Sequence, residues 1–264
     1  MIRLLRYVLS NYETLSPTLN WLLPVAYSTG SHSLLGMPWE IFRTTAILTD
    51  TNRPVTFVTK GGGLIGYYSY SILIPEYDLA VSILLSGDLG ALNPLLEKIT
   101  TPLVKAAEDS AQRSLKDSYA GTYVATDGVN ASADLNSSIT LEQSPSRSLF
   151  VSQWISNGTD VLPALTEFVA AQAGDGGNIY YQLIPTFEER LSGSQIGQVW
   201  RLTDVLNTPT DTNHTGDVWN DYCVSNVDPI IYAGKPLNEV VFWGDAKGVT
   251  EIELSAFRIV LSRQ

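Results

Sequence analysis

The sequence has 264 residues, of which 44% are hydrophobic and 16% are charged, so the chain can bury a sizeable core and is not a disordered segment. Its 16 basic and 27 acidic residues give a formal net charge of −11, which argues against nucleic acid as a partner. The acidic excess falls entirely in residues 117–264, because residues 1–116 carry as many basic as acidic side chains. No apolar run is long enough to cross a bilayer, and no membrane span is expected.

The amino-terminal segment has the spacing of an amphipathic helix, with apolar residues that fall on one face. Residues 3–23 predict two short helices, the second of which begins after Ser16 and ends at Pro24. Arginines interrupt the apolar stretch, which is also too short for an export signal. A domain that begins inside an ordinary helix is expected to be the later part of a longer protein.

A Ser- and Gly-rich loop is predicted over residues 27–36, followed by strands. The four predicted strands cover residues 39–45, 55–59, 67–74 and 79–85. The last two form a hairpin, since residues 75–78 have the composition of a tight turn. A helix then begins at Asn93 and continues to about Leu115, and Pro102 should kink it or divide it into two.

From Asp117 onward, short alternating segments recur between turn signals. The eight predicted strands cover residues 121–125, 138–141, 149–154, 179–183, 198–202, 239–243, 251–254 and 257–261. Only residues 161–171 suggest a helix. This pattern predicts an antiparallel barrel or sandwich, with a domain boundary near Lys116.

Few residues are available to hold a metal. The sequence has one cysteine, Cys223, and two histidines, His32 and His214, which exclude an internal disulfide framework and argue against a zinc site. No carboxylate spacing resembles a calcium-binding loop. We therefore expect no metal and no other cofactor.

The most unusual local feature is a strand that ends in Lys60 and is followed by three glycines, residues 61–63. Glycines let another backbone approach a strand closely, and a cation at the same place can hold a carboxylate or tune a neighbouring hydroxyl. The alternative is a glycine-rich hairpin loop with a solvated lysine. Residues 61–66 match the letters of a dinucleotide-binding turn, but a strand-like segment follows where a helix would be required, so that reading is rejected.

Residues 36–43, 58–62 and 66–78 resemble the later part of serine β-lactamase-like proteins, and more narrowly the fungal members of the class C β-lactamase and penicillin-binding-protein group. Residues 117–123 and 232–237 resemble the lipocalin-like C-terminal domain of the same proteins. The resemblance implies an α+β fold: residues 1–116 form part of a β-lactamase-like antiparallel sheet with packed helices, and residues 117–264 form an antiparallel β-barrel.

The resemblance also implies an acyl-transfer site built from three motifs. Lys60, Gly61 and Gly62 match the third motif, Lys-Thr-Gly, with glycine in place of threonine. Lys60 would supply positive charge beside the nucleophile, and Gly63 would offer a backbone N–H to the oxyanion hole. Gly61, Gly62 and Tyr68 would contact the substrate, a small ester, amide or lactam.

The other two motifs are missing from the sequence. No lysine has a serine three residues before it, and neither Tyr-x-Asn nor Ser-x-Asn occurs. A hydroxyl nucleophile without a neighbouring base is weak at neutral pH, so the chain alone is expected to be inactive. One hypothesis is a truncated serine hydrolase or acyltransferase. The alternative is a non-catalytic protein, derived from that family, which binds a small molecule or peptide. A truncated sheet would also leave an exposed edge for self-association.

Four Asn-x-Ser/Thr sequons lie in the acidic part, at Asn130, Asn136, Asn157 and Asn213. They favour a glycosylated surface and a secreted intact relative, although loops rich in Ser, Thr and Asn also produce sequons by chance.

Overall fold

The computed structural model describes residues 1–12, 14–15, 21–30, 32–125, 136–173, 179–206, 231–232, 234–245 and 248–264. The chain divides into two compact units, Met1–Ala111 and Gln112–Gln264. The division falls inside one long helix, α3 (Leu92–Tyr119), a few residues before the boundary predicted from the sequence. Each unit has its own sheet and is described separately below.

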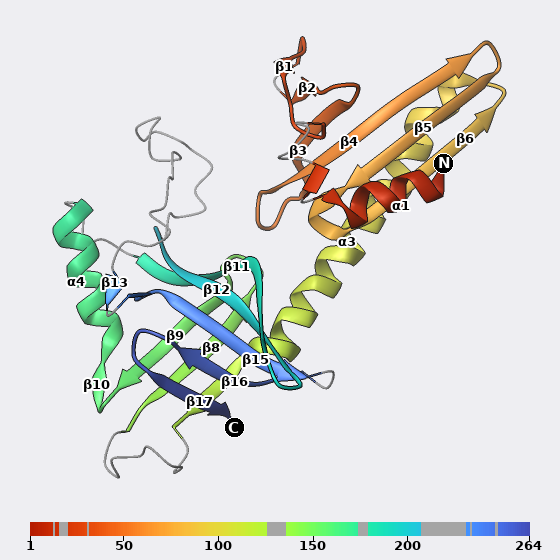
Figure 1. The fold of residues 1–264 in the computed structure, drawn as a ribbon. Helices are drawn as coiled ribbons and strands as arrows, with labels where there is room; N and C mark the ends of the chain where they lie inside the picture. Colours follow the sequence, from red (N-terminus) through yellow and green to blue (C-terminus); the bar gives the residue numbers. More distant parts are fainter. Residues whose placement is uncertain are drawn as a thin grey trace. The chain divides into compact units, whose positions relative to one another are not determined.

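The first unit contains an antiparallel sheet whose strands follow one another in chain order (Figure 1). Its strands are β1 (Ala26–Tyr27), β2 (Ser33–Leu35), β3 (Glu40–Leu48), β4 (Arg53–Leu64), β5 (Tyr67–Ile74) and β6 (Leu79–Ser86). All four predicted strands are present as β3 to β6. The prediction of a loop over residues 27–36 is wrong in part, because β1 and β2 pair there as a short ribbon beside β3.

Helices cover both faces of this sheet. Leu5 and Val8 of α1 (Ile2–Ser10) are buried in a cluster with Val58 and Leu73. On the opposite face, Val104 of α3 packs in a separate cluster that includes Phe57 and Ile72. The two clusters exist because successive side chains of a strand point to opposite faces. Most of the second predicted helix, which begins after Ser16 and ends at Pro24, falls on residues 16–20, which lie outside the described residues; residues 21–23 are described and are not helical.

The helix α3 runs without a break through Pro102, so the predicted division into two helices is wrong. Proline removes only one N–H from the helical ladder, that which would reach the carbonyl of Lys98, and the helix continues on either side of it. Two short 3₁₀ turns, η1 (Pro75–Tyr77) and η2 (Leu89–Ala91), flank β6.

A buried carboxylate ties α3 to its sheet. Glu108 accepts hydrogen bonds from the Arg53 guanidinium at 2.7 Å and from the Tyr77 hydroxyl at 2.6 Å. Burial and the bond to Glu108 raise the pKa of Tyr77 well above its usual range, so the hydroxyl stays protonated and donates at every pH at which the protein folds.

The second unit is a closed barrel. Its strands are β7 (Gly121–Val124), β8 (Ser138–Ser144), β9 (Ser148–Ser156), β11 (Ile179–Ser192), β12 (Gln195–Leu206), β15 (Glu239–Asp245), β16 (Gly248–Leu254) and β17 (Ile259–Arg263). The order is β9-β11-β12-β15-β16-β17-β7-β8, and the pairing of β8 with β9 closes the ring. Each of the eight predicted strands coincides with one of these, which confirms the antiparallel barrel.

The smaller elements of the second unit lie outside the ring. A helix, α4 (Val161–Ala173), follows the two-residue strand β10 (Thr159–Asp160), which pairs with β9. The strands β13 (Ile231–Tyr232) and β14 (Lys235–Pro236) pair only with each other. Because α4 covers residues 161–173, the helix predicted over residues 161–171 is confirmed.

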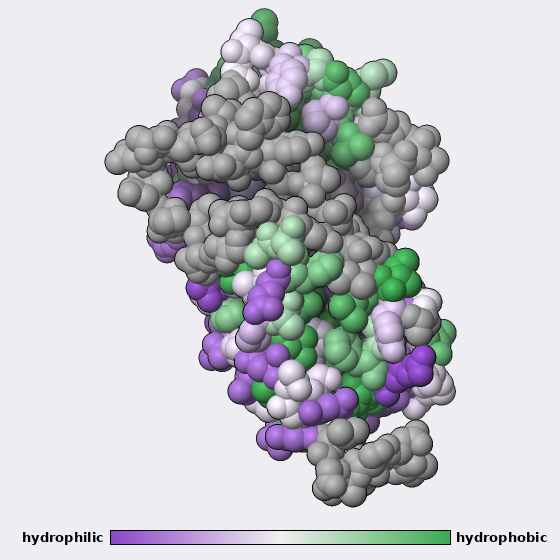
Figure 2. All heavy atoms as spheres, turned by 90° about the vertical axis from the view of Figure 1, so that its left-hand side faces the viewer, coloured by the Kyte–Doolittle hydropathy of each residue, from purple (hydrophilic) through white to green (hydrophobic). Residues whose placement is uncertain are grey.

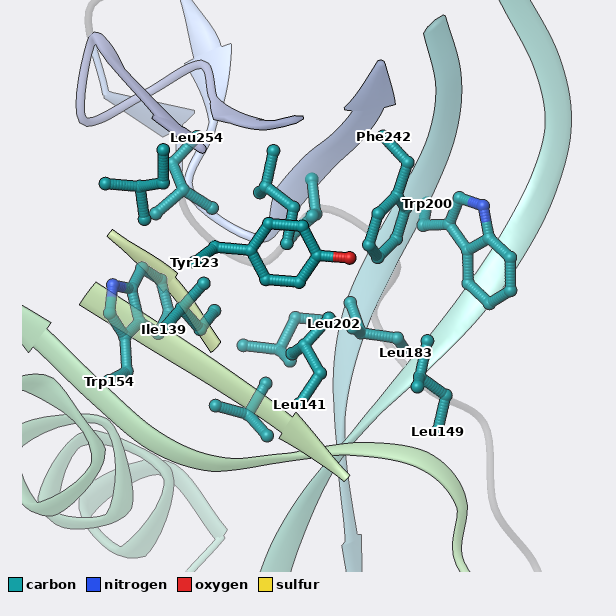
Figure 3. Packing of buried hydrophobic residues seen from close by; sticks show 14 of the residues in the cluster. Tyr123, Ile139, Leu141, Leu149, Trp154, Leu183, Trp200, Leu202, Phe242 and Leu254 are labelled. Atoms are coloured by element: carbon teal, nitrogen blue, oxygen red, sulfur yellow. The ribbon is translucent and has the colours of Figure 1, made fainter. Parts of the chain in front are cut away.

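Large side chains fill the barrel. Tyr123, Trp154 and Phe242 are each at most 2% exposed and belong to one cluster with residues of every ring strand (Figure 3). The aromatic rings of Tyr119, Trp200 and Phe242 meet edge to face or tilted, at centroid distances of 5.0 to 5.4 Å. The described part of the interior is thus a packed hydrophobic core. Outside, hydrophilic and hydrophobic residues are interspersed over the part of the molecule visible in Figure 2.

The end of the chain caps the end of α3. Arg263 on β17 donates to the carbonyl oxygens of Asp117 and Ser118 at 3.0 Å each and of Ala120 at 2.6 Å. These carbonyls have no acceptor role inside the helix, and a guanidinium at a helix C-terminus also opposes the negative end of the helix dipole. The last strand of the barrel therefore fixes the helix that leads into the first.

We expect Arg263→Met to lower the free energy of unfolding by about 2 kcal/mol, because three charge-assisted hydrogen bonds are lost and two of their acceptors, the carbonyls of Ser118 and Ala120, stay partly buried. Urea denaturation followed by tryptophan fluorescence measures the change. Arg258→Met is the matched control, since the exposed Arg258 side chain makes none of these contacts. Equal stability of the two variants would contradict the capping role.

Candidate active site

The three glycines belong to a strand, not to a hairpin loop. β4 continues through residues 61–63 to Leu64, and the turn to β5 consists of Ile65 and Gly66, whose φ is +83°. The alternative of a glycine-rich hairpin loop is therefore wrong. On its other side β4 pairs with β3 only as far as Thr59, opposite Glu40. From Lys60 onward, β4 pairs with β5 alone among the described residues, and we call its other side the free edge of β4.

The register places the predicted site residues on both faces of the sheet. Lys60 is opposite Ser71 of β5, and Gly62 is opposite Ser69. These residues lie on the face of the sheet that α1 covers at Val58 and Leu73. Gly61 and Gly63 are opposite Tyr70 and Tyr68, on the face of α3. Tyr68 therefore lies on the other face from Lys60, and these two side chains do not point to the same side of the sheet.

The tyrosines of β5 explain why glycines are needed in β4. A Cβ at Gly61 would lie 3.3 Å from the ring of Tyr70, and one at Gly63 would lie 3.1 Å from the ring of Tyr68. A Cβ at Gly62 would approach the Ser69 hydroxyl to 2.8 Å. Tyr70 thus fills the space in which the threonine of the related motif would place its side chain.

The Lys60 ammonium forms an ion pair with Glu40, which the sequence reasoning did not identify. The distance from Lys60 Nζ to Glu40 Oε1 is 2.5 Å, and the N–H of Gly61 donates to Glu40 Oε2 at 3.4 Å. Both side chains are nearly half exposed, so the ammonium is neither buried nor shielded from a ligand. The Gly61 N–H points away from β5, and by the alternation of an antiparallel ladder the N–H of Gly63 does the same.

A hollow of about 530 Å³ lies at the end of the sheet beside this edge. Its walls include three predicted site residues, Gly62, Gly63 and Tyr68. The remaining walls are Leu64, Tyr67, Ser69, Leu84, Leu85 and Ser86. Ser69 and Leu84 were missed by the sequence reasoning, because their place opposite Gly62 depends on the pairing of three strands.

A second hollow, of about 400 Å³, lies between the sheet and α3. Its lining is mainly apolar and includes Phe42, Phe57, Tyr70 and Leu96. The two phenylalanine rings stack at a centroid distance of 6.1 Å. None of Lys60, Gly62 and Gly63 borders it, and it contains no predicted site residue.

Two of the four sequons fall on described residues. Asn136 and Asn157 are both exposed, and the carbonyl of Asn136 accepts a hydrogen bond from the N–H of Gly158 at 2.7 Å. Asn130 and Asn213 lie outside the described residues, as do Cys223 and His214.

In the described residues, a lysine at the edge of an antiparallel strand, with glycines beside it and a hollow near them, is followed along the chain by a closed barrel. This is the order of elements that the resemblance to β-lactamase-like proteins implies. The Ser-x-x-Lys motif of such proteins does not occur in the sequence. Within the described part of the chain, no helix is long and apolar enough to cross a membrane.

Comparison with known proteins identifies the family. Residues 111–264 match a family model described as "Beta-lactamase-like-like, C-terminal domain", and the chain belongs to this β-lactamase-like family. It is 44% identical over 268 residues to a "Probable hydrolase M10" of Phoma sp. and 43% identical over 268 residues to a "Probable hydrolase clz13" of Cochliobolus lunatus. It is 26% identical over 259 residues to a "Beta-lactamase-like protein" of Arthroderma benhamiae.

These alignments cover 98%, 98% and 91% of this chain but only 43%, 42% and 43% of the relatives. The chain therefore spans less than half the length of the relatives that it matches. No solved structure matches the chain.

Proposed function

We propose that this chain is the later part of a serine hydrolase or acyltransferase, and that the free edge of β4 forms one wall of its acyl-transfer site. The observation that carries the proposal is the position of Lys60: its half-exposed ammonium lies beside Glu40, the first residue of β3, and two residues before Gly62, which borders the hollow. Two relatives that bear the name of hydrolase support it.

Each residue of this edge has a role in the proposal. The Lys60 ammonium stabilises negative charge on the attacking oxygen and on the tetrahedral intermediate. The Gly63 N–H, directed away from β5, donates to the oxyanion, and Gly61 and Gly62 allow the substrate backbone to approach. The acyl group occupies the hollow bordered by Gly62, Gly63 and Tyr68. The serine and its basic partner come from a segment that precedes this chain in its relatives.

The test compares the chain alone with the chain joined to the preceding segment of the Phoma relative. A chromogenic butyrate ester should give a burst of product, equal to the enzyme concentration, with the joined protein and none with the chain alone. Turnover by the chain alone would contradict the proposal. Tight binding of the ester without any burst in the joined protein would favour the alternative, a non-catalytic binding protein.

We also propose that the chain alone self-associates through β6. This strand is at the edge of its sheet and has no charged residue and no proline, the features with which proteins protect edges. Leu84 on β6 is 76% exposed. We expect light scattering to show dimers or larger species for the chain and a return toward monomer for Leu84→Lys. A monodisperse wild-type monomer would contradict this prediction.

Secretion and glycosylation of the intact protein complete the proposal. Asn136 and Asn157 are exposed, as an acceptor must be. Expression through a eukaryotic secretory pathway should give a protein whose mass falls on treatment with an amidase that removes N-glycans. The double variant Asn136→Gln, Asn157→Gln should lose part of that shift. No change of mass on treatment would contradict this prediction.

A further inference from the structure

The side chain of Glu40 lies across the free edge of β4. Glu40 is opposite Thr59, on the face of α3, whereas Lys60 starts from the opposite face. The Glu40 carboxylate nevertheless reaches the Lys60 ammonium at 2.5 Å and the Gly61 N–H at 3.4 Å. The side chain of Glu40, the first residue of β3, therefore passes around the free edge of β4. One carboxylate of the chain thus occupies both donors that this edge offers at Lys60 and Gly61.

This arrangement changes what the edge can bind. A lysine alone would attract a ligand carboxylate, but the Lys60–Glu40 pair has no net charge. A carboxylate that approached Lys60 would come within a few ångströms of Glu40, where two like charges repel each other. A neutral carbonyl can accept from the ammonium or from Gly61 without this repulsion, since an exposed ion pair is weak and easily rearranged.

The hollow beside the edge favours the same kind of ligand. Leu64, Tyr67 and Leu84 border it, and their side chains are 78%, 68% and 76% exposed. Ser69 and Ser86 are polar but uncharged, and none of the described residues that border the hollow is charged. Its walls therefore match an apolar, uncharged acyl group.

We propose that Glu40 sets the specificity of this site: the site takes neutral acyl compounds and discriminates against those that carry a carboxylate next to the acyl group. This inference rests on the proposed function for the place of the site, but it concerns binding and requires no nucleophile. Glu40 acts by occupying the anion-binding position at Lys60 and Gly61.

The experiment is a titration of the ¹⁵N-labelled full chain with N-butyrylglycine and with its methyl ester, followed by the amide signals of Gly61, Gly62 and Gly63. We expect the methyl ester to bind the wild type at least fivefold more tightly than the acid. In Glu40→Gln, whose amide oxygen can still accept from Gly61, binding of the acid should tighten roughly fivefold to tenfold while binding of the ester changes less than twofold.

Asp50→Asn is the matched control. It removes the same charge from an exposed carboxylate at the other end of β3, and it should leave both affinities unchanged. Three results would each overturn the proposal. They are equal affinity of the wild type for the acid and the ester, a gain in affinity for the acid in Asp50→Asn as large as that in Glu40→Gln, and no response of the three glycine amides to either compound. Absence of an ester burst in the joined protein, with the discrimination intact, would overturn the catalytic function alone.

Discussion

Replacing Lys60 with methionine is expected to reduce kcat/KM of the joined protein for a neutral ester by roughly 100-fold to 10,000-fold. The ammonium is the only cation at the free edge of β4 among the described residues that border the site or pair with it, and groups that stabilise developing charge or transfer a proton contribute factors of this size. Methionine keeps the length of the side chain. Because Lys60 is nearly half exposed, the loss of its charge should leave β4 folded.

One further variant separates the role of the Lys60 charge from a role in proton transfer, and another serves as a control. Lys60→Arg keeps the charge but cannot give up a proton at neutral pH, so it should retain most activity if the charge alone matters and little if proton transfer matters. Lys98→Met removes an exposed charge from α3 and is the control for unspecific effects. Activity of Lys60→Met within threefold of the wild type would rule out a role of Lys60 in the reaction.

The barrel could be predicted almost completely from the sequence. Most of its strands alternate between a packed interior and a mixed exterior over the predicted residues, as in β8, where Ile139 and Leu141 are buried and Ser138 and Thr140 are only partly buried. The strands β11 and β12 extend well beyond the residues predicted for them, because their outer halves pair with each other across a bulge and lack the apolar alternation.

The site could be predicted only in part. The position of Lys60 on a strand follows from the residues around it, but its pairing with Glu40 depends on the register of β3 against β4 and on where β3 ends. Glu40 precedes Lys60 by 20 residues, and no local pattern marks the two as partners. The residues around the glycines favour a hairpin loop over a strand, because the tyrosines that hold the glycines in the sheet belong to the next strand.

The largest effect on stability is expected in the barrel, at a carboxylate between two guanidinium groups. Glu239 on β15 is 3% exposed and accepts two hydrogen bonds from Arg190 at 2.9 Å each and one from Arg201 at 3.3 Å. Glu239→Gln would remove the buried carboxylate that the two guanidinium groups share, although Arg190 would keep its ion pair with Glu188 at 3.5 Å. We expect a loss of about 3 kcal/mol in the free energy of unfolding by urea. Glu189→Gln, an exposed change on the same strand as Arg190, should cost less than about 0.5 kcal/mol.

The same cluster predicts how stability depends on pH. Burial alone would raise the pKa of Glu239, but the hydrogen bonds from Arg190 and Ser255 and the charges of Arg190 and Arg201 outweigh it and hold the pKa below its ordinary value of 4.5. The unfolded chain therefore takes up this proton at a higher pH than the folded one. The stabilisation is complete above pH 4.5 and is lost as the pH falls through the lowered pKa. Urea denaturation at a series of pH values should therefore show that the difference in free energy of unfolding between the wild type and Glu239→Gln becomes smaller below pH 4.5. A difference that becomes larger below this pH would contradict this role of Glu239.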